Sequence, residues 1–343
     1  MHNIINEILK YKSISIIGNY KNVGKTTTLN YIIDGARDNI VLGLTSIGVD
    51  GEDEDIVTKT YKPRVYINKG TIIATAKACA LKSDITKEIL DVTNINTPMG
   101  KVVILKALSD GYIELAGPSI NSQTKYICSK LNEFGANIVI VDGALSRKTM
   151  ASPSITEATL FCTGAVLSTS IDKVVDLTVH EFNMLNMKKV EDHRFYNLYN
   201  DYLSKAKISI VDNSYNYKNL DFKTTLGVNK DIVDNIDDNS KYLVVNGIIV
   251  NSFIENLIKS TDKYKNFTIL VKDGTKIFLD KEIYHKFIKL GGSIKVIDKI
   301  NIIGVSVNPK SIKGYSFESN KFIKQIQKHI HIPVFDVIGG DKN

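Results

Sequence analysis

Residues Gly18 to Thr26 carry the residue spacing most closely tied to a known chemistry. They read Gly-Asn-Tyr-Lys-Asn-Val-Gly-Lys-Thr, which matches the pattern of glycine, four variable residues, glycine, lysine and serine or threonine at every position. In this pattern the backbone N–H groups between the glycines converge on a phosphate, and a following helix adds the partial positive charge of its N-terminus. The sequence therefore predicts a loop that binds the phosphates of a nucleotide.

Each residue type in this loop has an expected role. Gly18 lets a strand turn sharply, and Gly24 allows the backbone to approach the phosphate closely. Lys25 reaches the β- and γ-phosphates, and the Thr26 hydroxyl takes a coordination position on Mg²⁺. The residues expected to contact the nucleotide are Gly18, Asn22, Val23, Gly24, Lys25, Thr26 and Thr27. The alternative is a chance glycine-rich turn, against which the strand-like segment before the loop and the helix-like segment after it both argue.

Asp142 is the candidate for a second metal-binding group. It follows four apolar β-branched residues, Ile138 to Val141, and precedes Gly143. This pattern predicts a buried strand whose carboxyl end presents the acid beside the phosphate loop, where a P-loop enzyme needs a carboxylate for Mg²⁺. The alternative is an ordinary turn aspartate in an Asp-Gly pair. We expect the metal-binding role, because the strand is wholly apolar and its order along the chain is that of P-loop enzymes.

An acidic segment after the second predicted strand supplies two further candidates. Residues 50–55 contain five acids within six positions. Asp50 is the best placed to orient an attacking water, and Glu52 is the next candidate. A solvated acidic loop is the alternative for both, and it explains the acids at 53–55 better, because crowded carboxylates repel one another unless they bind a cation. The expected catalytic residues are Lys25, Asp50 and Asp142, and the expected metal ligands are Thr26, Glu52 and Asp142.

The nucleobase is inferred from a pattern that the chain lacks. Guanine is commonly read by Asn-Lys-x-Asp, and residues 229–232 break that pattern at its last position. Residues 169–172 follow a predicted strand, but they have a serine where the lysine should lie against the base. We therefore expect ATP in preference to GTP, with Mg²⁺ as its companion cation.

Alternating strand-like and helix-like segments predict an α/β fold, a P-loop NTPase with a mostly parallel sheet. A nucleotide-binding domain is expected over residues 1–211, with a β-rich insertion at about 57–116. Within that insertion one helix is expected, from Lys87 to Asn94. The polar residues 212–240 predict a linker, and residues 241–343 predict a C-terminal α/β domain.

Composition and charge limit the class of protein. Hydrophobic residues make up 43% of the 343 residues and charged residues 24%, the balance of an ordinary soluble globular protein. The net charge is +7 (44 − 37), but the lysines are interleaved with acids, so we expect no nucleic-acid partner. No apolar run reaches the ~18 residues that span a bilayer, and no secretory signal is expected. With three widely spaced cysteines, these features predict a cytoplasmic protein without a membrane anchor.

Two resemblances go beyond the P-loop pattern. The Val-Gly-Lys-Thr ending of the loop resembles that of dethiobiotin synthetase and its relatives, whereas the extra lysine of minicell-inhibition-type ATPases is replaced by Tyr20. The loop, the segment Thr45–Glu52, the strand end Asp142–Ala144 and the run Val271–Thr275 together resemble the P-loop subunit of the reactivating factor for adenosylcobalamin-dependent lysine 5,6-aminomutase. This second resemblance covers nearly the whole chain.

The resemblance to the reactivating factor implies a function. Such a factor uses ATP and Mg²⁺ to help expel damaged cobalamin from the aminomutase, and it acts with a second, different subunit. The implied partners are therefore an adenosylcobalamin-dependent aminomutase and a second reactivase subunit. In this reading the chain is a chaperone-like ATPase whose nucleotide cycle changes its grip on another enzyme.

Two other functions remain open at this point. One is a small-molecule ATP-dependent ligase or kinase resembling dethiobiotin synthetase, and the other is a metallochaperone GTPase. The absent guanine pattern and the absence of metal-ligand spacings in the sequence disfavour the GTPase. A compact ligase needs little beyond the nucleotide domain, whereas this chain has a predicted insertion and an additional C-terminal unit, which favour partner binding.

Overall fold

The chain folds into two compact units, described here from a computed structural model. The structure describes residues 4–36, 40–48, 64–143, 152, 154–220 and 230–339. The first unit comprises Met1–Glu181 and Asn301–Asn343, and the second comprises Phe182–Ile300. The chain therefore leaves the first unit once and returns to it for its last segment.

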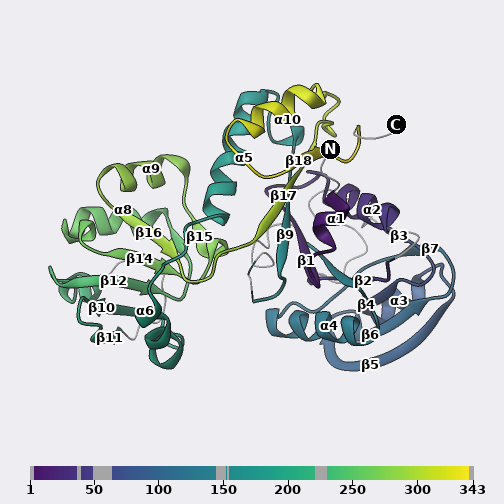
Figure 1. Ribbon diagram of the computed structural model, residues 1–343, viewed down its shortest axis with the longest axis horizontal. Coiled ribbons are helices and arrows are strands. Elements are labelled where there is room, and N and C mark those ends of the chain that lie inside the picture. Colours follow the sequence, from purple (N-terminus) through teal and green to yellow (C-terminus); the bar gives the residue numbers. More distant parts are fainter. Residues whose placement is uncertain are drawn as a thin grey trace. The chain divides into compact units, whose positions relative to one another are not determined.

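A nine-stranded, mostly parallel sheet forms the centre of the first unit (Figure 1). Its strands lie in the order β18-β17-β9-β1-β8-β2-β4-β6-β5. Every neighbouring pair from β18 to β4 is parallel, and β6 runs antiparallel to both β4 and β5. The strands span Ser13–Gly18 (β1), Leu42–Ser46 (β2), Ile72–Ala76 (β4), Lys87–Thr97 (β5), Gly100–Ala107 (β6), Ile138–Asp142 (β8), Ala158–Gly164 (β9), Ile302–Asn308 (β17) and Val334–Asp336 (β18). The predicted α/β class with a mostly parallel sheet is confirmed.

Apolar residues on β1 and on the helix that follows it form the core beside the predicted loop. Ile14 and Ile16 of β1 are fully buried and share a cluster with Leu29 and Ile32. The last two belong to α2 (Lys25–Gly35), which packs against β1. Strands buried on both faces read as continuous apolar runs, which explains why β8 could be recognised in the sequence. The other helices that lie wholly in this unit are α1 (Ile4–Ile8), α3 (Lys77–Lys82), α4 (Asn121–Glu133) and α10 (Ser319–Gln327).

The β-rich region after β2 extends the central sheet. Its strands β4, β6 and β5 form one end of the sheet. Strand β3 (Val65–Ile67), which precedes them in the sequence, and β7 (Gly111–Ile113), which follows them, form a separate small antiparallel sheet. The helix predicted from Lys87 to Asn94 is wrong, because these residues belong to strand β5, which pairs with β6. The apolar spacing of this segment fits a helix as well as a strand, and pairing with β6 decides between them.

The second unit has its own five-stranded sheet, in the order β11-β10-β12-β14-β16. Strands β12, β14 and β16 are parallel to one another, and β10 is antiparallel to both β11 and β12. These strands span Ile208–Asp212 (β10), Tyr217–Leu220 (β11), Ser240–Val245 (β12), Thr268–Val271 (β14) and Ser293–Val296 (β16). A two-residue parallel pair, β13 (Ile249–Val250) with β15 (Ile277–Phe278), accompanies them.

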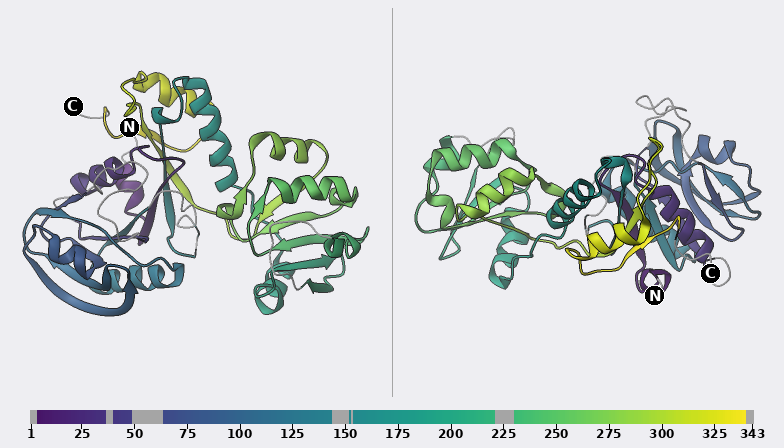
Figure 2. Two further views of the ribbon diagram at one scale, coloured as in Figure 1. Left: turned by 180° about the vertical axis from the view of Figure 1, so that it is seen from behind. Right: turned by 90° about the horizontal axis from the view of Figure 1, so that it is seen from above.

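Helices cover both faces of this second sheet (Figures 1 and 2). Leu243 and Val245 of β12 share a buried cluster with residues of α8 and α9, whereas Tyr242 and Val244 share another with residues of α6. Alternate residues of one strand therefore point into two different cores. The helices of this unit are α6 (His193–Leu198), α7 (Lys230–Asp234), α8 (Asn251–Ser260) and α9 (Lys281–Lys289), and α5 (Ile171–Leu185) begins in the first unit and ends in the second.

The observed division differs from the boundaries expected at residues 211 and 240. The described parts of the segment 212–240 include β11 and α7, so this polar segment contributes to the second unit. Strand β17 pairs with β9, which places the last residues of the chain in the first unit. Polar residues on an edge strand resemble a linker in composition, and an apolar run does not reveal which of two sheets it will join.

The helices are short, and the longest of those in the described ranges is α5, with 15 residues. None of the helices in these ranges combines the length and the apolar character that crossing a bilayer requires.

Candidate functional site

The predicted phosphate loop lies at the carboxyl edge of the central sheet. Strand β1 ends at Gly18 and α2 begins at Lys25, so residues 19–24 form the connection. The two neighbours of β1 are parallel to it, with Asp142 of β8 opposite Ile16 and Cys162 of β9 opposite Gly18. Because the carboxyl ends of parallel strands meet at one edge of a sheet, the loop and Asp142 lie close together.

Both glycines of the loop are required by close contacts. A Cβ atom on Gly18 would lie 2.5 Å from the Val23 side chain, which is itself completely buried. Gly24 has a φ of +94°, and a Cβ there would lie 3.2 Å from Cβ of Asn308. Asn22, with a φ of +57°, also has a left-handed backbone, which asparagine tolerates better than most residues. The spacing of glycine and asparagine in the sequence therefore corresponds to real backbone requirements.

Two carbonyl groups of the loop are held by side chains. Lys25 Nζ donates to the Tyr20 carbonyl at 3.1 Å, and Asn308 Nδ2 donates to the Asn22 carbonyl at 3.3 Å. The C=O and N–H of one planar trans peptide point in opposite directions, so the N–H of Val23 points away from Asn308. Because these two carbonyls are held, the N–H groups of the same two peptides, those of Lys21 and Val23, have fixed directions as well.

The start of α2 offers further backbone donors. The cap residue is Gly24, which has no side chain that could cap the helix, and the first N–H groups of a helix have no partner within the helix itself. Such an N-terminus, with its partial positive charge, is suited to an anion. Lys25 lies in this first turn, where burial lowers its pKa and the nearby Cys162 and Asp142 partly offset that effect. The side chain of Lys25 and the unpaired N–H groups of the first turn therefore both lie at the N-terminus of α2.

The three threonines after Lys25 differ in exposure. Thr26 and Thr27 are partly exposed in the first turn of α2, so their hydroxyls lie at the edge of the loop. Thr28 is completely buried, and its hydroxyl donates to the Gly24 carbonyl at 2.9 Å and lies 2.8 Å from Ser306 Oγ. The roles expected for Thr26 and Thr27 stay predictions, whereas Thr28 fastens the helix to β17.

Asp142 carries an oxygen that has no partner. Its Oδ1 atom is buried and accepts no hydrogen bond, although buried carboxylate oxygens are nearly always paired. Burial raises the pKa of Asp142 to about 6, and the charge of Lys25 and the N–H of Gly143 act in the opposite direction. A carboxylate with an unpaired oxygen beside the predicted phosphate loop fits the chemistry of an Mg²⁺ ligand, directly or through water.

Two of the predicted site residues, Asp50 and Glu52, lie outside the described residues. The others, from Gly18 to Thr27 together with Asp142, lie at one edge of the sheet. Within the described ranges no group of three or more His, Cys, Asp or Glu side chains is arranged around a common metal position.

The sequence did not indicate the residues that β9 and β17 bring to the loop. Asn308 contacts the Asn22 carbonyl and Gly24, and the Cys162 carbonyl accepts a hydrogen bond from the Asn19 N–H at 3.2 Å. Burial raises the pKa of the Cys162 thiol to about 11, so this cysteine is neutral. The pair Asn308-Pro309 marks the end of β17 in the sequence. It indicates a residue near the loop only once β17 is known to join this sheet.

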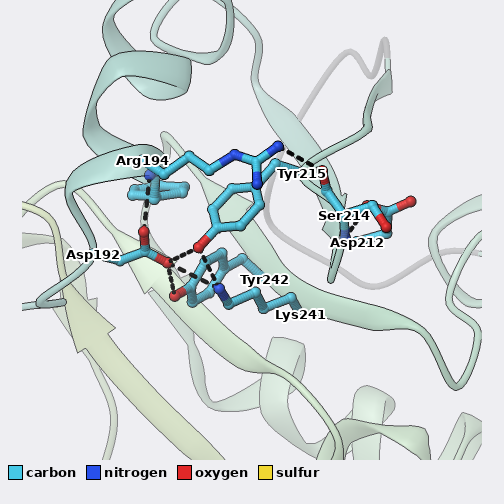
Figure 3. Close-up of polar contacts among 8 residues, drawn as sticks. Asp192, Arg194, Asp212, Ser214, Tyr215, Lys241 and Tyr242 are labelled. Carbon is cyan, nitrogen blue, oxygen red and sulfur yellow. Dashed lines mark hydrogen bonds and ion pairs between the residues drawn. The ribbon is translucent and has the colours of Figure 1, made fainter.

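A second polar cluster surrounds Asp192 in the second unit (Figure 3). Asp192 Oδ1 caps α6 by accepting the Phe195 N–H at 3.0 Å. Asp192 Oδ2 accepts from the hydroxyls of Tyr215 and Tyr242, both at 2.7 Å, and pairs with Lys241 Nζ at 3.0 Å. The carboxylate thus joins a helix start, a loop and a strand.

This Asp192 cluster has a structural role. Burial raises the pKa of Asp192, but hydrogen bonds from Tyr215, Tyr242, the Phe195 N–H and Lys241 outweigh that effect and hold the pKa below its usual range. Tyr215 has a φ of +68°, an uncommon value for a tyrosine, and its ring also lies against the Arg194 guanidinium. Both oxygens of Asp192 are already paired, and the cluster fastens the 213–216 loop.

Comparisons with known proteins add no assignment. No family model, curated protein or solved structure matches the chain.

The contact between Asn308 and the loop leads to a testable expectation. In Asn308→Asp an acceptor replaces the Nδ2 donor and faces the Asn22 carbonyl, so the loop should lose its fixed orientation. We expect affinity for a non-hydrolysable ATP analogue with Mg²⁺ to fall about tenfold, the equivalent of one lost hydrogen bond. Calorimetric titration measures this, with Lys310→Ala as the control, because Lys310 bonds Asn308 through its backbone N–H, which the substitution keeps. Unchanged affinity in Asn308→Asp would show that the contact does not shape the site.

The Asp192 cluster predicts a pH-dependent stability. A carboxylate whose folded-state pKa is depressed stabilises the fold above its unfolded pKa of ~3.9, and this contribution is lost as the pH falls further. Asp192→Asn should therefore destabilise the second unit by about 2 kcal/mol at pH 7 and by much less at pH 3. Urea unfolding followed by circular dichroism at both pH values measures the difference, with substitution of the exposed Asp238 by Asn as the control. The same destabilisation at both pH values would contradict the assignment.

Proposed function

We propose that this chain binds ATP with Mg²⁺ at residues 18–27 and hydrolyses it to remodel a partner enzyme. The observation that carries the nucleotide site is the loop between β1 and α2, whose carbonyls are held by Lys25 and Asn308. Asp142, on the adjacent strand, supports it with an unpaired buried oxygen. These features match the sequence pattern residue by residue, so the motif and its setting support the same ligand.

The residues of the loop would divide the work of binding. Lys25 would leave the Tyr20 carbonyl and contact the β- and γ-phosphates as a point charge, while the N–H groups at the start of α2 bind phosphate oxygens. Thr26 and Asp142 would hold Mg²⁺, which neutralises charge on the phosphates when it is bound. Asp50 is the proposed residue for orienting the attacking water, and Glu52 is a further proposed metal ligand.

The partner is proposed from the resemblance to the reactivating factor and from the second unit. Residues Phe182–Ile300 have their own sheet and their own buried clusters, which a phosphate loop does not require. Such an additional body offers surface to which a partner protein could bind. We therefore propose that the chain is the ATPase subunit of a cytoplasmic reactivase, which acts with a second subunit to release damaged cobalamin from an adenosylcobalamin-dependent aminomutase.

Nucleotide binding is tested by removing the charge of the loop. Lys25→Ala should weaken binding of Mg²⁺ and a non-hydrolysable ATP analogue by tenfold to a hundredfold, roughly the loss of a charge-assisted hydrogen bond. Asp142→Asn should spare binding of the metal-free analogue and lose most of the gain that Mg²⁺ provides. Calorimetric titration measures both, and Lys12→Ala is the control for a lost positive charge outside the loop. Equal affinity in the wild type and Lys25→Ala would refute the site.

The reactivase function is tested by recovery of an inactivated enzyme. Aminomutase inactivated during turnover is incubated with this chain, its companion subunit, Mg²⁺ and fresh adenosylcobalamin. Activity should return with ATP and not with ADP, because a client is driven only by the difference in its affinity for the two nucleotide states. The Lys25→Ala chain should not support recovery. Equal recovery under all three conditions would refute the proposal, and fast ATP turnover with a small carboxylate or amine and no partner would favour a ligase or kinase.

A further inference from the structure

A chain of three side chains leads from the loop into helix α5. Asn19 Nδ2 donates to Thr163 Oγ1 at 3.2 Å, and Thr163 Oγ1 lies 2.7 Å from Thr178 Oγ1. Thr178 Oγ1 in turn donates to the Val174 carbonyl at 2.7 Å, within α5. Both threonines are completely buried, so water does not compete for these hydrogen bonds.

The direction of every hydrogen bond in this chain is determined. A carbonyl can only accept, so the single hydroxyl proton of Thr178 is used on Val174. The proton between the two threonines must then come from Thr163, and the Thr163 oxygen is left to accept from Asn19. The amide of Asn19 therefore has one favoured orientation, with its NH₂ group toward Thr163.

This orientation leaves Asn19 Oδ1 as an acceptor with a vacancy. The atom is buried and has no hydrogen-bond partner. A buried acceptor without a donor is unfavourable, so a ligand that brings an O–H or N–H group to Asn19, or that shifts the loop until one reaches it, relieves a cost of the ligand-free state. Water bound to Mg²⁺ is a donor of this kind, whereas a bare phosphate oxygen is not.

Helix α5 connects this chain of hydrogen bonds to the second unit. The helix is continuous from Ile171 to Leu185, and the boundary between the units falls within it, after Glu181. Its last turn is held in the second unit, where Met184 is buried and a Cβ on Gly274 would lie 2.5 Å from the Met184 and Leu185 carbonyls. A change at Thr178 therefore acts on a helix whose other end is packed in the second unit.

We propose that the Asn19–Thr163–Thr178 chain couples occupancy of the loop to helix α5, and through α5 to the second unit. This inference rests on the proposed nucleotide site and names its regulation. Binding of Mg²⁺–ATP gives Asn19 Oδ1 a donor, strengthens the hydroxyl chain and steadies α5. By linkage, if the bound nucleotide changes the affinity of a partner that binds through α5, that partner changes the affinity for the nucleotide by the same factor.

The test measures hydrogen exchange of the full chain with and without Mg²⁺ and a non-hydrolysable ATP analogue. In the wild type, the analogue should slow amide exchange in α5, including residues 182–185, by about fivefold or more. Thr178→Val removes only the hydroxyl and does not touch the loop. This variant should still bind the analogue, about fivefold more weakly, and the analogue should no longer slow exchange in α5.

Two further variants separate the coupling from general effects on helix stability. Thr178→Ser keeps the hydroxyl and should behave as the wild type does. Thr124→Val removes a buried hydroxyl of α4 that donates to the carbonyl of Ile120, the residue before that helix, and it should leave the response of α5 intact. A full response of α5 in Thr178→Val, or binding by the wild type without any response in α5, would overturn the coupling alone. Absence of binding by the wild type would overturn both the coupling and the nucleotide site.

Discussion

The parallel register of β8, β1 and β9 is the constraint on which the rest of the site depends. It sets Asp142 opposite Ile16 and Cys162 opposite Gly18, so the loop emerges between two buried neighbours. A slip of one residue would turn the side chains of a strand to the other face of the sheet. The burial of Ile14 and Ile16 against α2 excludes such a slip. The apolar pattern of β1 thus determines where the polar loop begins.

The loop is shaped by parts of the chain that lie far from it in the sequence. Asn308, 286 residues from Asn22, holds the carbonyl of that residue, and the β9 residue Thr163, 144 residues from Asn19, orients the Asn19 amide. These contacts exist because the chain returns to the first unit after building the second. The chain passes between the units twice, in α5 and in the segment that enters β17. Helix α5 follows β9, and both β9 and β17 are hydrogen-bonded to the loop. A site built in this way is suited to passing information about its ligand to the remainder of the chain.

The sequence predicted what depends on local pattern. The strand, the glycine-bounded loop and the helix start were expected because each is specified by neighbouring residues, and the apolar run before Asp142 marked β8 equally well. Strand β5 was missed because its apolar spacing also fits a helix. The roles of Asn308 and Thr163, and the carboxylate cluster of Asp192, could not be expected, since each joins segments separated by dozens of residues or more. The water-orienting role of Asp50 stays a prediction, because that residue lies outside the described ranges.

The central claim is that residues 18–27 hold the phosphates of a nucleotide. The most direct measurement is a crystal structure of the full chain grown with Mg²⁺ and a non-hydrolysable ATP analogue. Phosphate oxygens should then lie within hydrogen-bond distance of the N–H groups from Val23 to Thr26. Lys25 should also have left the Tyr20 carbonyl, and Asp142 Oδ1 should face the metal. A nucleotide bound elsewhere, or a loop that stays empty at saturating analogue, would contradict the claim.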